Sequence, residues 1–277
     1  MTPCTKRSSP APSGTELQHR NLSHYIEIER EVPEVDDDCP LVVVGVDGSH
    51  TALNAAQWAV AEAVSRGTRL ELVYAQSDSG GGAMASGRAS RVLDAAYAAV
   101  TADSPTVRVQ TVCLAGSAER VLIEESKDAS MICIGARGRF GAPLGPIATA
   151  LGQDARCSVA IIRECVDQRT GVISVVLDDA PDNDAVVYQA MKEGRMRKAT
   201  VRQIDRRTNS WVRRFPDVHV ETVAAGCGPH GLYPPESALP QLAVVGRADA
   251  QRIGELVSPN CHPIVGYPEC SVLLVRN

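Results

Sequence analysis

Three glycines spaced three residues apart suggest the chemistry of anion binding. Gly135, Gly138 and Gly141 follow the apolar run at 131–134, and a helical pattern begins near Pro146. The bare backbone N–H groups of such a loop can face a phosphate, and the dipole of the following helix favours negative charge at its start. A side chain would block the close approach or the positive φ that the loop needs. The stretch therefore predicts a phosphate-binding loop.

This loop matches neither of two familiar phosphate-binding motifs. No Gly-Lys-Ser/Thr follows, and the spacing is Gly-x-x-Gly-x-x-Gly rather than Gly-x-Gly-x-x-Gly. An alternative without chemistry stays open, in which the glycines only make a tight turn from strand to helix. Arg137 and Arg139 add positive charge, and Arg139 is the favoured phosphate ligand. Pro146 suits a first helical position, and Thr149 offers a hydroxyl near the first turn.

A second candidate group follows an earlier apolar run. Residues 41–49 read LVVVGVDGS, which is typical of a buried parallel strand that ends at Asp47. In an open parallel sheet, ligands bind beyond the carboxyl ends of the strands, at the switch point of the topology. Asp47 and Gly135 would then face one crevice. The simpler reading of Asp47 is a turn residue before a helix.

The elements that position these residues alternate along the chain. Helical patterns at 52–65, 89–101 and 119–126 separate apolar runs at 41–46, 70–75, 107–114 and 131–134, and a last strand follows at 158–162. This alternation implies an α/β fold with an open parallel sheet and helices on both faces. Ser49 or Thr51 is expected to cap the first helix, Gly67 to end it, and Ser117 to cap the third.

The second half of the chain repeats the first. Residues 171–178 again form an apolar run that ends in aspartate, and CSVLLVR at 270–276 mirrors CSVAIIR at 157–163. A repeat of this length indicates two copies of one domain. Asp249 stands where Gly138 stands, and an acid there would repel a phosphate. The second copy is therefore predicted to be degenerate, with Asp178 a turn or cap residue.

Length and composition limit the classes of protein. The 277 residues suggest two domains, predicted at 40–165 and 171–277, after a partly disordered leader at 1–39 in which 24–35 could form an edge strand. The net charge of −5 argues against a nucleic-acid binder. No apolar run reaches the roughly 18 residues of a membrane span. Nine unpatterned cysteines without an export signal indicate a cytoplasmic protein, and six histidines show no metal-ligand spacing.

With these motifs in place, the chain resembles the universal stress protein family in its tandem two-domain form. The resemblance rests on VVVGVDGS at 42–49 and on Gly-x-x-Gly ahead of a helix and a Cys-Ser-Val strand. It implies two Rossmann-like domains of the adenine nucleotide alpha-hydrolase-like type, related by a pseudo-two-fold axis. It also implies ATP as ligand, with or without Mg²⁺. The implied cofactor-binding residues are Gly45, Asp47, Gly135, Gly138, Arg139, Phe140, Gly141, Gly145 and Thr149.

The family motif fits this chain in two registers. In the nucleotide-binding branch, nine residues separate Gly-x-x-Gly from a Gly-Ser or Gly-Thr pair. Counted forward from Gly138, Ala148 and Thr149 take the place of that pair; counted back from Cys157, Gly145 and Pro146 take it. Both registers depart from the family pattern at the end of the loop.

Three functions follow from the resemblance. The first is an ATP-binding module in a stress response, acting on an unidentified protein partner. The second is an interaction protein of the same fold without nucleotide. The third is a very slow ATPase, with at most weak hydrolysis, since no general base, arginine finger or Walker B acid is evident. The resemblance also implies an intramolecular pseudo-dimer, compatible with further homodimerisation, with Val159, Ile161, Val272 and Leu274 in contact across the axis.

Overall fold

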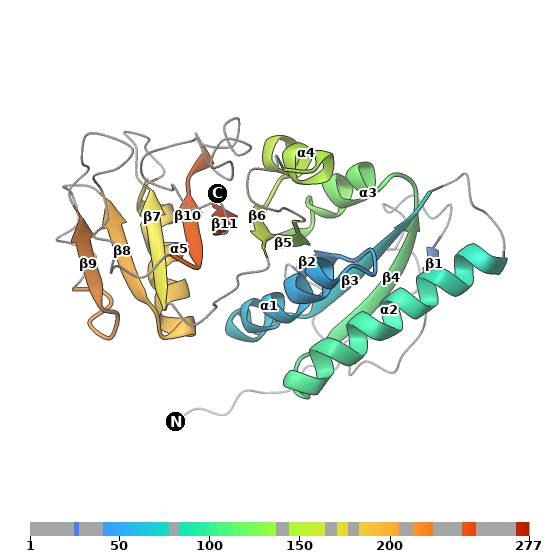
Figure 1. The fold of residues 1–277 in the computed structure, drawn as a ribbon, viewed down its shortest axis with the longest axis horizontal. Helices are drawn as coiled ribbons and strands as arrows, with labels where there is room; N and C mark the ends of the chain where they lie inside the picture. Colours follow the sequence, from blue (N-terminus) through green and yellow to red (C-terminus); the bar gives the residue numbers. More distant parts are fainter. Residues whose placement is uncertain are drawn as a thin grey trace, which may run out of the picture.

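A computed structural model arranges the chain as one wide, mostly parallel sheet with helices on both faces (Figure 1). The structure describes residues 25–27, 41–77, 83–136, 144–163, 171–176, 183–204, 213–223, 240–247 and 270–276. The elements are β1 (Tyr25–Glu27), β2 (Leu41–Gly45), α1 (His50–Arg66), β3 (Leu70–Gln76), α2 (Ala83–Asp103), β4 (Val109–Ala115), α3 (Ala118–Glu125), β5 (Ala129–Gly135), α4 (Pro146–Asp154), β6 (Ser158–Ile162), β7 (Val172–Val176), α5 (Asn183–Arg197), β8 (Thr200–Ile204), β9 (Val220–Val223), β10 (Leu242–Val245) and β11 (Ser271–Leu274).

The same strand order occurs twice in this sheet. Across the described residues the order is β1-β4-β3-β2-β5-β6-β11-β10-β7-β8-β9. The strands β4-β3-β2-β5-β6 are parallel neighbours, and β9-β8-β7-β10-β11 repeat that arrangement. The chain first builds outward from β2 on one side and then from β5 on the other, so the switch point lies between β2 and β5. The predicted fold class is confirmed.

The two halves meet through their last strands. Strands β6 and β11 pair antiparallel, with Val272 opposite Ile161 and Leu274 opposite Val159. These four residues were the predicted contacts across the pseudo-two-fold axis, and the prediction is confirmed. We call this strand pair the β6–β11 joint.

Matching polar contacts flank the β6–β11 joint. The backbone N–H of Arg276 donates to Ser158 Oγ, and that of Arg163 donates to Ser271 Oγ, each at 3.1 Å. The two bonds are equivalent, because each serine begins a final strand and each arginine follows one. The guanidinium of Arg276 also donates to three backbone carbonyls at the C-terminal end of α4, where positive charge complements the helix dipole.

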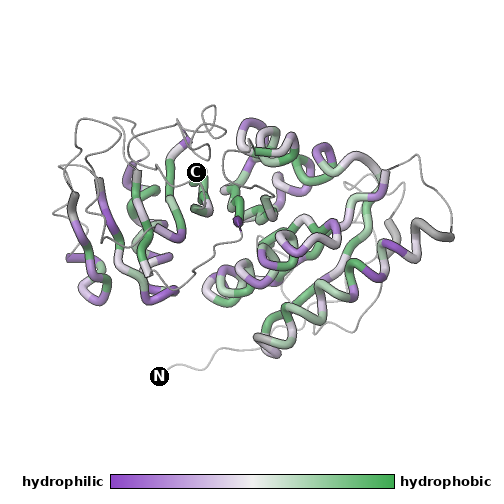
Figure 2. The backbone as a smooth tube through the Cα atoms, in the orientation of Figure 1, coloured by the Kyte–Doolittle hydropathy of each residue, from purple (hydrophilic) through white to green (hydrophobic). Residues whose placement is uncertain are grey.

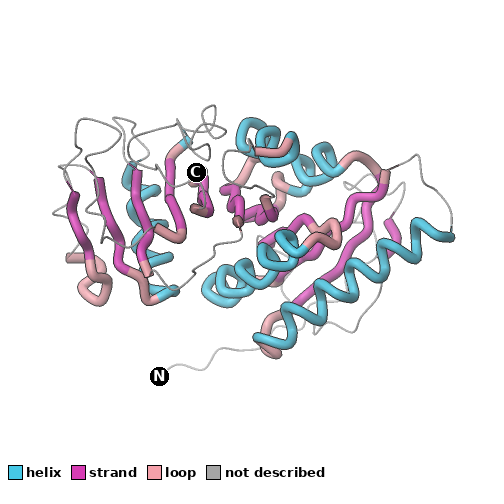
Figure 3. The backbone as a smooth tube through the Cα atoms, in the orientation of Figure 1, coloured by secondary structure: helices cyan, strands magenta, loops and turns pink. Residues whose placement is uncertain are grey.

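Both faces of the sheet are buried, and this explains the unbroken apolar runs in the sequence. Val42 and Val44 belong to a first cluster of buried residues that includes side chains of α1, α2 and α5, whereas Leu41 and Val43 belong to a second cluster that includes side chains of α3 and α4. Successive side chains of a strand point to opposite faces, so burial on both requires apolar residues throughout. Figures 2 and 3 show the largely hydrophobic strands of the first half with α1 and α2 on one side and α3 and α4 on the other. The first cluster extends from α1 to α5, so the core continues past the β6–β11 joint.

The predicted helix ends are mostly confirmed. Ser49 Oγ accepts the N–H of Ala52 at 3.3 Å, Ser117 Oγ accepts an α3 N–H at 3.4 Å, and Gly67 ends α1 with φ of 65°. Helix α2 begins at Ala83, whereas the sequence predicted a start at 89. The additional turn contains the exposed Gly87, which costs about 1 kcal/mol relative to alanine inside a helix.

The leader contributes one strand to the described residues. The edge strand predicted within 24–35 is found as β1, which pairs antiparallel with β4. The disorder predicted for the start of the leader, at 1–15, falls outside the part that the structure describes. Of the helices that are described, none is long and apolar enough to cross a membrane.

Candidate functional site

A pocket of about 320 Å³ opens at the carboxyl ends of β2 and β5, at the switch point of the first half. Helices α3 and α4 supply further parts of its wall. Asp47 is the only ionisable side chain among the described residues that line it, so the wall is largely apolar. The described lining consists of Gly45, Val46, Asp47, Ala52, Val73, Ala75, Ala118, Leu122, Ile134, Gly135, Ala136, Gly145, Pro146, Ile147 and Ala148.

The two strand-end glycines serve different purposes. A Cβ on Gly45 would lie 2.9 Å from Leu122 Cδ1, a flexible side chain of the pocket wall, so Gly45 keeps this space open. A Cβ on Gly135 would lie 2.3 Å from the backbone carbonyl of Thr51 and 2.5 Å from the N of Ala52. Gly135 therefore lets the first turn of α1 lie directly against β5. That contact fixes the start of α1 beside the pocket.

Asp47 combines the two roles suggested by the sequence. Its Oδ1 accepts the backbone N–H of Ser49 at 2.8 Å, which closes the turn ahead of α1. Gly48 within this turn has φ of 83°, a left-handed conformation that favours glycine. The Asp47 side chain is exposed and also lines the pocket. One carboxylate thus holds the turn and contributes the negative charge of the pocket wall.

Helix α4 begins at the pocket. Gly145 is its N-cap without a side-chain hydrogen bond, and Pro146 is the first helical residue. The first intrahelical bond joins the N–H of Thr149 to the carbonyl of Gly145 at 3.1 Å, so the N–H groups of Ile147 and Ala148 precede it. Such first-turn N–H groups and the helix dipole favour an anion. Of the two registers, the one that ends at Gly145 and Pro146 coincides with the helix start.

The predicted site residues fall into three groups. Gly45, Asp47, Gly135 and Gly145 surround one pocket. Thr149 lies in α4 outside the pocket lining, and its hydroxyl donates to the carbonyl of Gly145 at 3.2 Å. Gly138, Arg139, Phe140 and Gly141 belong to 137–143 and lie outside the described residues.

Sequence reasoning missed the apolar wall. Val73, Ala118, Leu122 and Ile134 line the pocket, and none was a candidate. Ala118 and Leu122 stand four residues apart on α3 and so share one face, which is the available signal. An apolar pair at this spacing has the same pattern as ordinary core packing, so the sequence alone does not separate the two.

The described cysteines take no part in this site. Cys113, Cys133, Cys157 and Cys270 are buried, and these four form no disulfide. Burial raises the pKa of Cys157 to about 11 and that of Cys133 well above its usual range. A thiol with such a pKa is a poor nucleophile, so Cys133 and Cys157 act as small hydrophobes. Within the described ranges, no group of three His, Cys, Asp or Glu side chains converges as a metal site needs.

Fold and pocket together define a doubly wound α/β protein with its crevice at the switch point of a parallel sheet. The sequence pattern of the universal stress protein family matches residues 41–163. A universal stress protein of Mycobacterium tuberculosis is 37% identical over 262 residues, covering 85% of this chain and 96% of its own. A second from that organism is 31% identical over 274 residues, with the same coverage. The chain belongs to the universal stress protein family.

Solved structures show the same fold over both halves. A universal stress protein from Archaeoglobus fulgidus aligns with 85% of this chain and 98% of its own, with a TM-score of 0.59 and 13% identity. A functionally unknown protein from Pseudomonas aeruginosa aligns with 86% of this chain and 92% of its own, with a TM-score of 0.57 and 15% identity. Both alignments extend well beyond one copy of the repeat, in agreement with the tandem layout.

Proposed function

We propose that the pocket in the first half binds an adenine nucleotide, with ATP as the expected ligand, and that the chain acts as a stress-response regulatory module. The observation that carries the proposal is the meeting of the strand-end glycines Gly45 and Gly135 with the start of α4 at one largely apolar pocket. An apolar cavity with a few polar groups at defined places suits a flat ring with a polar extension.

The polar groups of the pocket suggest how the nucleotide lies. The N–H groups at the start of α4 suit the phosphates, because that end of a helix favours negative charge. The carboxylate of Asp47 would repel phosphates and therefore suits the sugar hydroxyls or a cation such as Mg²⁺. The loop with Gly138, Arg139, Phe140 and Gly141 joins Gly135 to the start of α4 in sequence, and we expect it to complete the phosphate site.

The proposal places the nucleotide in a first domain at 40–165. A second domain at 171–277 carries Asp249 in place of the loop glycine and serves as a degenerate partner. The leader occupies 1–39, and the setting is the cytoplasm, with an unidentified protein partner. Hydrolysis is expected to be at most weak, because Asp47, the ionisable side chain among the described lining residues, already accepts the N–H of Ser49.

One observation favours a second candidate, an interaction protein of the same fold that binds no nucleotide. Pro146 lacks an N–H and stands at the first helical position, so it removes one donor from the proposed phosphate end. The hydroxyl of Thr149 is also engaged with the carbonyl of Gly145. Purified protein, denatured and tested for released adenine nucleotide, separates the two candidates. Turnover of added ATP with magnesium tests for slow hydrolysis.

We predict that Gly145→Trp weakens ATP binding about tenfold or more, the equivalent of roughly 1.4 kcal/mol or more. A Cβ at Gly145 meets open space and the backbone there is extended, with φ of −63°, so an indole can enter the pocket without backbone strain. Titration calorimetry of the full chain measures the effect. The matched control is Gly87→Trp, which places the same ring at an exposed glycine of α2.

The same titration tests where the nucleotide binds. About one ATP per chain is expected, since the second copy carries an acid in its loop. Two equal sites would contradict the assignment to the first domain. Unchanged affinity in Gly145→Trp, with binding intact in the control, would move the ligand away from this pocket.

A further inference from the structure

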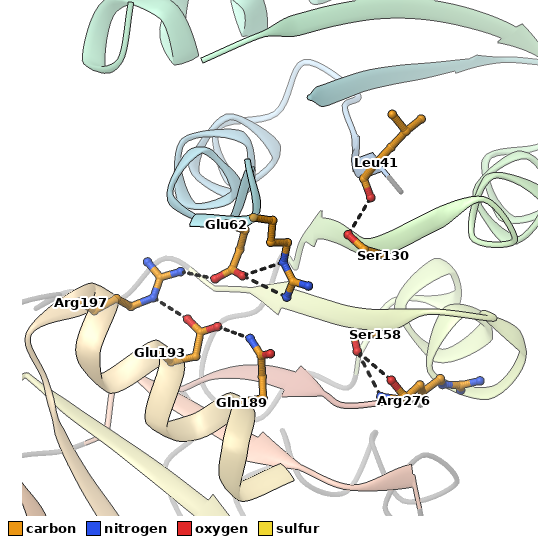
Figure 4. A network of polar contacts seen from close by, with 9 residues as sticks. Leu41, Glu62, Ser130, Ser158, Gln189, Glu193, Arg197 and Arg276 are labelled. Carbon is orange, nitrogen blue, oxygen red and sulfur yellow. Dashed lines mark hydrogen bonds and ion pairs between the residues drawn. The ribbon is translucent and has the colours of Figure 1, made fainter. Parts of the chain in front are cut away.

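A cluster of charged side chains is buried where α1 of the first half meets α5 of the second (Figure 4). Glu62 on α1 is 1% exposed and Glu193 on α5 is fully buried. Arg197 on α5 donates to both, from Nη2 to Glu62 Oε1 at 3.3 Å and from Nε to Glu193 Oε2 at 2.9 Å. One guanidinium therefore bridges two buried carboxylates that come from different halves of the chain.

The remaining partners of the two carboxylates differ in charge. Arg66 donates from Nη2 and Nε to Glu62 Oε2, at 3.3 and 3.4 Å. Gln189 donates from Nε2 to Glu193 Oε1 at 2.7 Å. Glu62 thus accepts hydrogen bonds from two arginines, whereas Glu193 accepts them from one shared arginine and from a neutral amide. The Arg66 side chain is 21% exposed and contacts Glu62 on the oxygen that does not meet Arg197, so its charge is partly screened by solvent.

The cluster is built from a repeated motif. Glu62 and Arg66 occupy the positions in α1 that Glu193 and Arg197 occupy in α5, counted from the aspartate that follows the first strand of each half. In both helices the residue after the arginine is left-handed, with φ of 65° and 52°. The pseudo-two-fold axis therefore relates the two Glu-x-x-x-Arg motifs and brings two like carboxyl groups together.

The groups that face Glu193 favour its neutral form. Burial is the main reason that the pKa of Glu193 is raised to about 8; the charge of Glu62 and its hydrogen-bond contact act in the same direction, and Arg197 acts against them. Arg66 reaches the cluster from α1, as described above. Cys133 on β5 lies within electrostatic reach of Glu62 and Arg197, and its own raised pKa keeps it neutral.

We propose that the Glu193 carboxyl, which Arg197 bridges to Glu62, holds a proton at neutral pH, and that this proton stabilises the contact of α1 with α5 across the two halves. Two buried carboxylates that share one guanidinium do not both ionise without cost, since like charges and desolvation each oppose the second ionisation. Release of the proton to solvent leaves a buried negative charge, which Arg197 neutralises only in part because it also pairs with Glu62. The contact between the halves then loosens. The inference needs no nucleotide and is independent of the proposed function.

The sign of the pH dependence follows from a carboxyl whose pKa is higher in the folded chain. The pKa of Glu193 is raised from its ordinary value of 4.5 to about 8. Between these two pH values, the folded chain holds a proton that the unfolded chain has released. The stabilising contribution is complete below the ordinary pKa and is lost as pH rises through about 8. In this window the folding equilibrium constant falls by up to about tenfold per pH unit because of this site.

Urea unfolding of the full chain between pH 5 and 9 tests the proposal with Glu193→Gln, the neutral isostere of the protonated form. We expect the folding constant of the variant, relative to that of the unsubstituted chain, to rise by up to about tenfold per unit toward pH 8 and then to level off. Glu124→Gln is the matched control, since Glu124 is 67% exposed and its substitution leaves the profile parallel to that of the unsubstituted chain. A ratio for Glu193→Gln that does not change with pH overturns the proposal.

A titration of the unsubstituted chain followed by carbon-13 NMR of the carboxyl groups tests the proton directly, whether or not the variant folds. One glutamate carboxyl should titrate near pH 8, and its signal should be absent in Glu193→Gln. Amide hydrogen exchange in β6 and β11, corrected for intrinsic base catalysis, should quicken as pH rises toward 8 in the unsubstituted chain alone and should then level off. Titration of every glutamate below pH 6 contradicts a proton held by Glu193, and unchanged exchange contradicts the link to the β6–β11 joint.

Discussion

The double substitution Val159→Asp with Val272→Asp is expected to separate the two halves or to unfold the chain. Val159 is fully buried and Val272 is 1% exposed, and both belong to the β6–β11 joint. Each substitution forfeits apolar burial worth about 1.5–3 kcal/mol and brings a carboxylate into an apolar cluster. Domains of this kind are stable by only about 5–15 kcal/mol, so two such losses exceed what many chains tolerate.

Small-angle scattering and urea unfolding measure the two outcomes. A separated pair of halves gives a larger radius of gyration with helical content retained, whereas an unfolded chain gives a still larger radius of gyration and loses its helical content. The matched control is Val64→Asp, the same change at a valine of α1 that is 53% exposed. Retention of compact size and of the original stability in the double variant would show that the halves are held together by other contacts.

Gly135→Ala is expected to destabilise the protein by about 3 kcal/mol, the upper end of the usual cost of overpacking. The added Cβ would lie 2.3 Å from the backbone of Thr51, and backbone cannot move aside as a side chain can. The first turn of α1 must shift away from β5, so the variant should also bind ATP more weakly.

The sign of this effect separates it from the ordinary result of such a substitution. Replacing glycine by alanine usually stabilises a protein by about 0.4–1 kcal/mol where the backbone allows it, because the unfolded chain loses freedom. Gly87→Ala, at an exposed helical glycine with open space around it, is the control and should show that gain. Urea unfolding measures both variants. A gain in Gly135→Ala would mean that α1 does not rest on β5 as closely as we describe.

Local sequence features predicted most of the fold, because helix caps, turns and strand patterns depend mainly on residues that are close in the sequence. Ser49, Ser117 and Gly67 have capping or left-handed roles that depend on neighbouring residues alone. Apolar runs with no polar alternation indicated strands covered on both sides, and the family resemblance implied how the halves join. Helix α2 was predicted too short, since Gly87 within it has the same local appearance as a helix boundary.

Contacts between distant segments explain what could not be predicted. Glu62 with Arg66, and Glu193 with Arg197, have the spacing of an exposed ion pair on a helix surface. Only the approach of α1 to α5 across the halves buries them, and no local pattern carries that information. In the pocket, Asp47 and Gly135 were predicted from strand-end and loop chemistry, and Gly45 and Gly145 from the family resemblance. The apolar wall was not, because apolar residues have the same pattern in a pocket and in a core.

The antiparallel β6–β11 joint also changes how the protein can vary. In an assembly of two identical chains, a mutation in the gene changes the residue on both sides of a two-fold contact. Here the two sides belong to one chain, so a mutation changes the residue on one side only. Equivalent positions can therefore diverge independently. Trp58 and Gln189 are such a pair: the tryptophan ring lies 4.1 Å from the guanidinium carbon of Arg197, while the glutamine holds the Glu193 carboxyl. Two identical chains could not make this division at a single residue position, so covalent fusion allows a symmetric contact to acquire unequal sides.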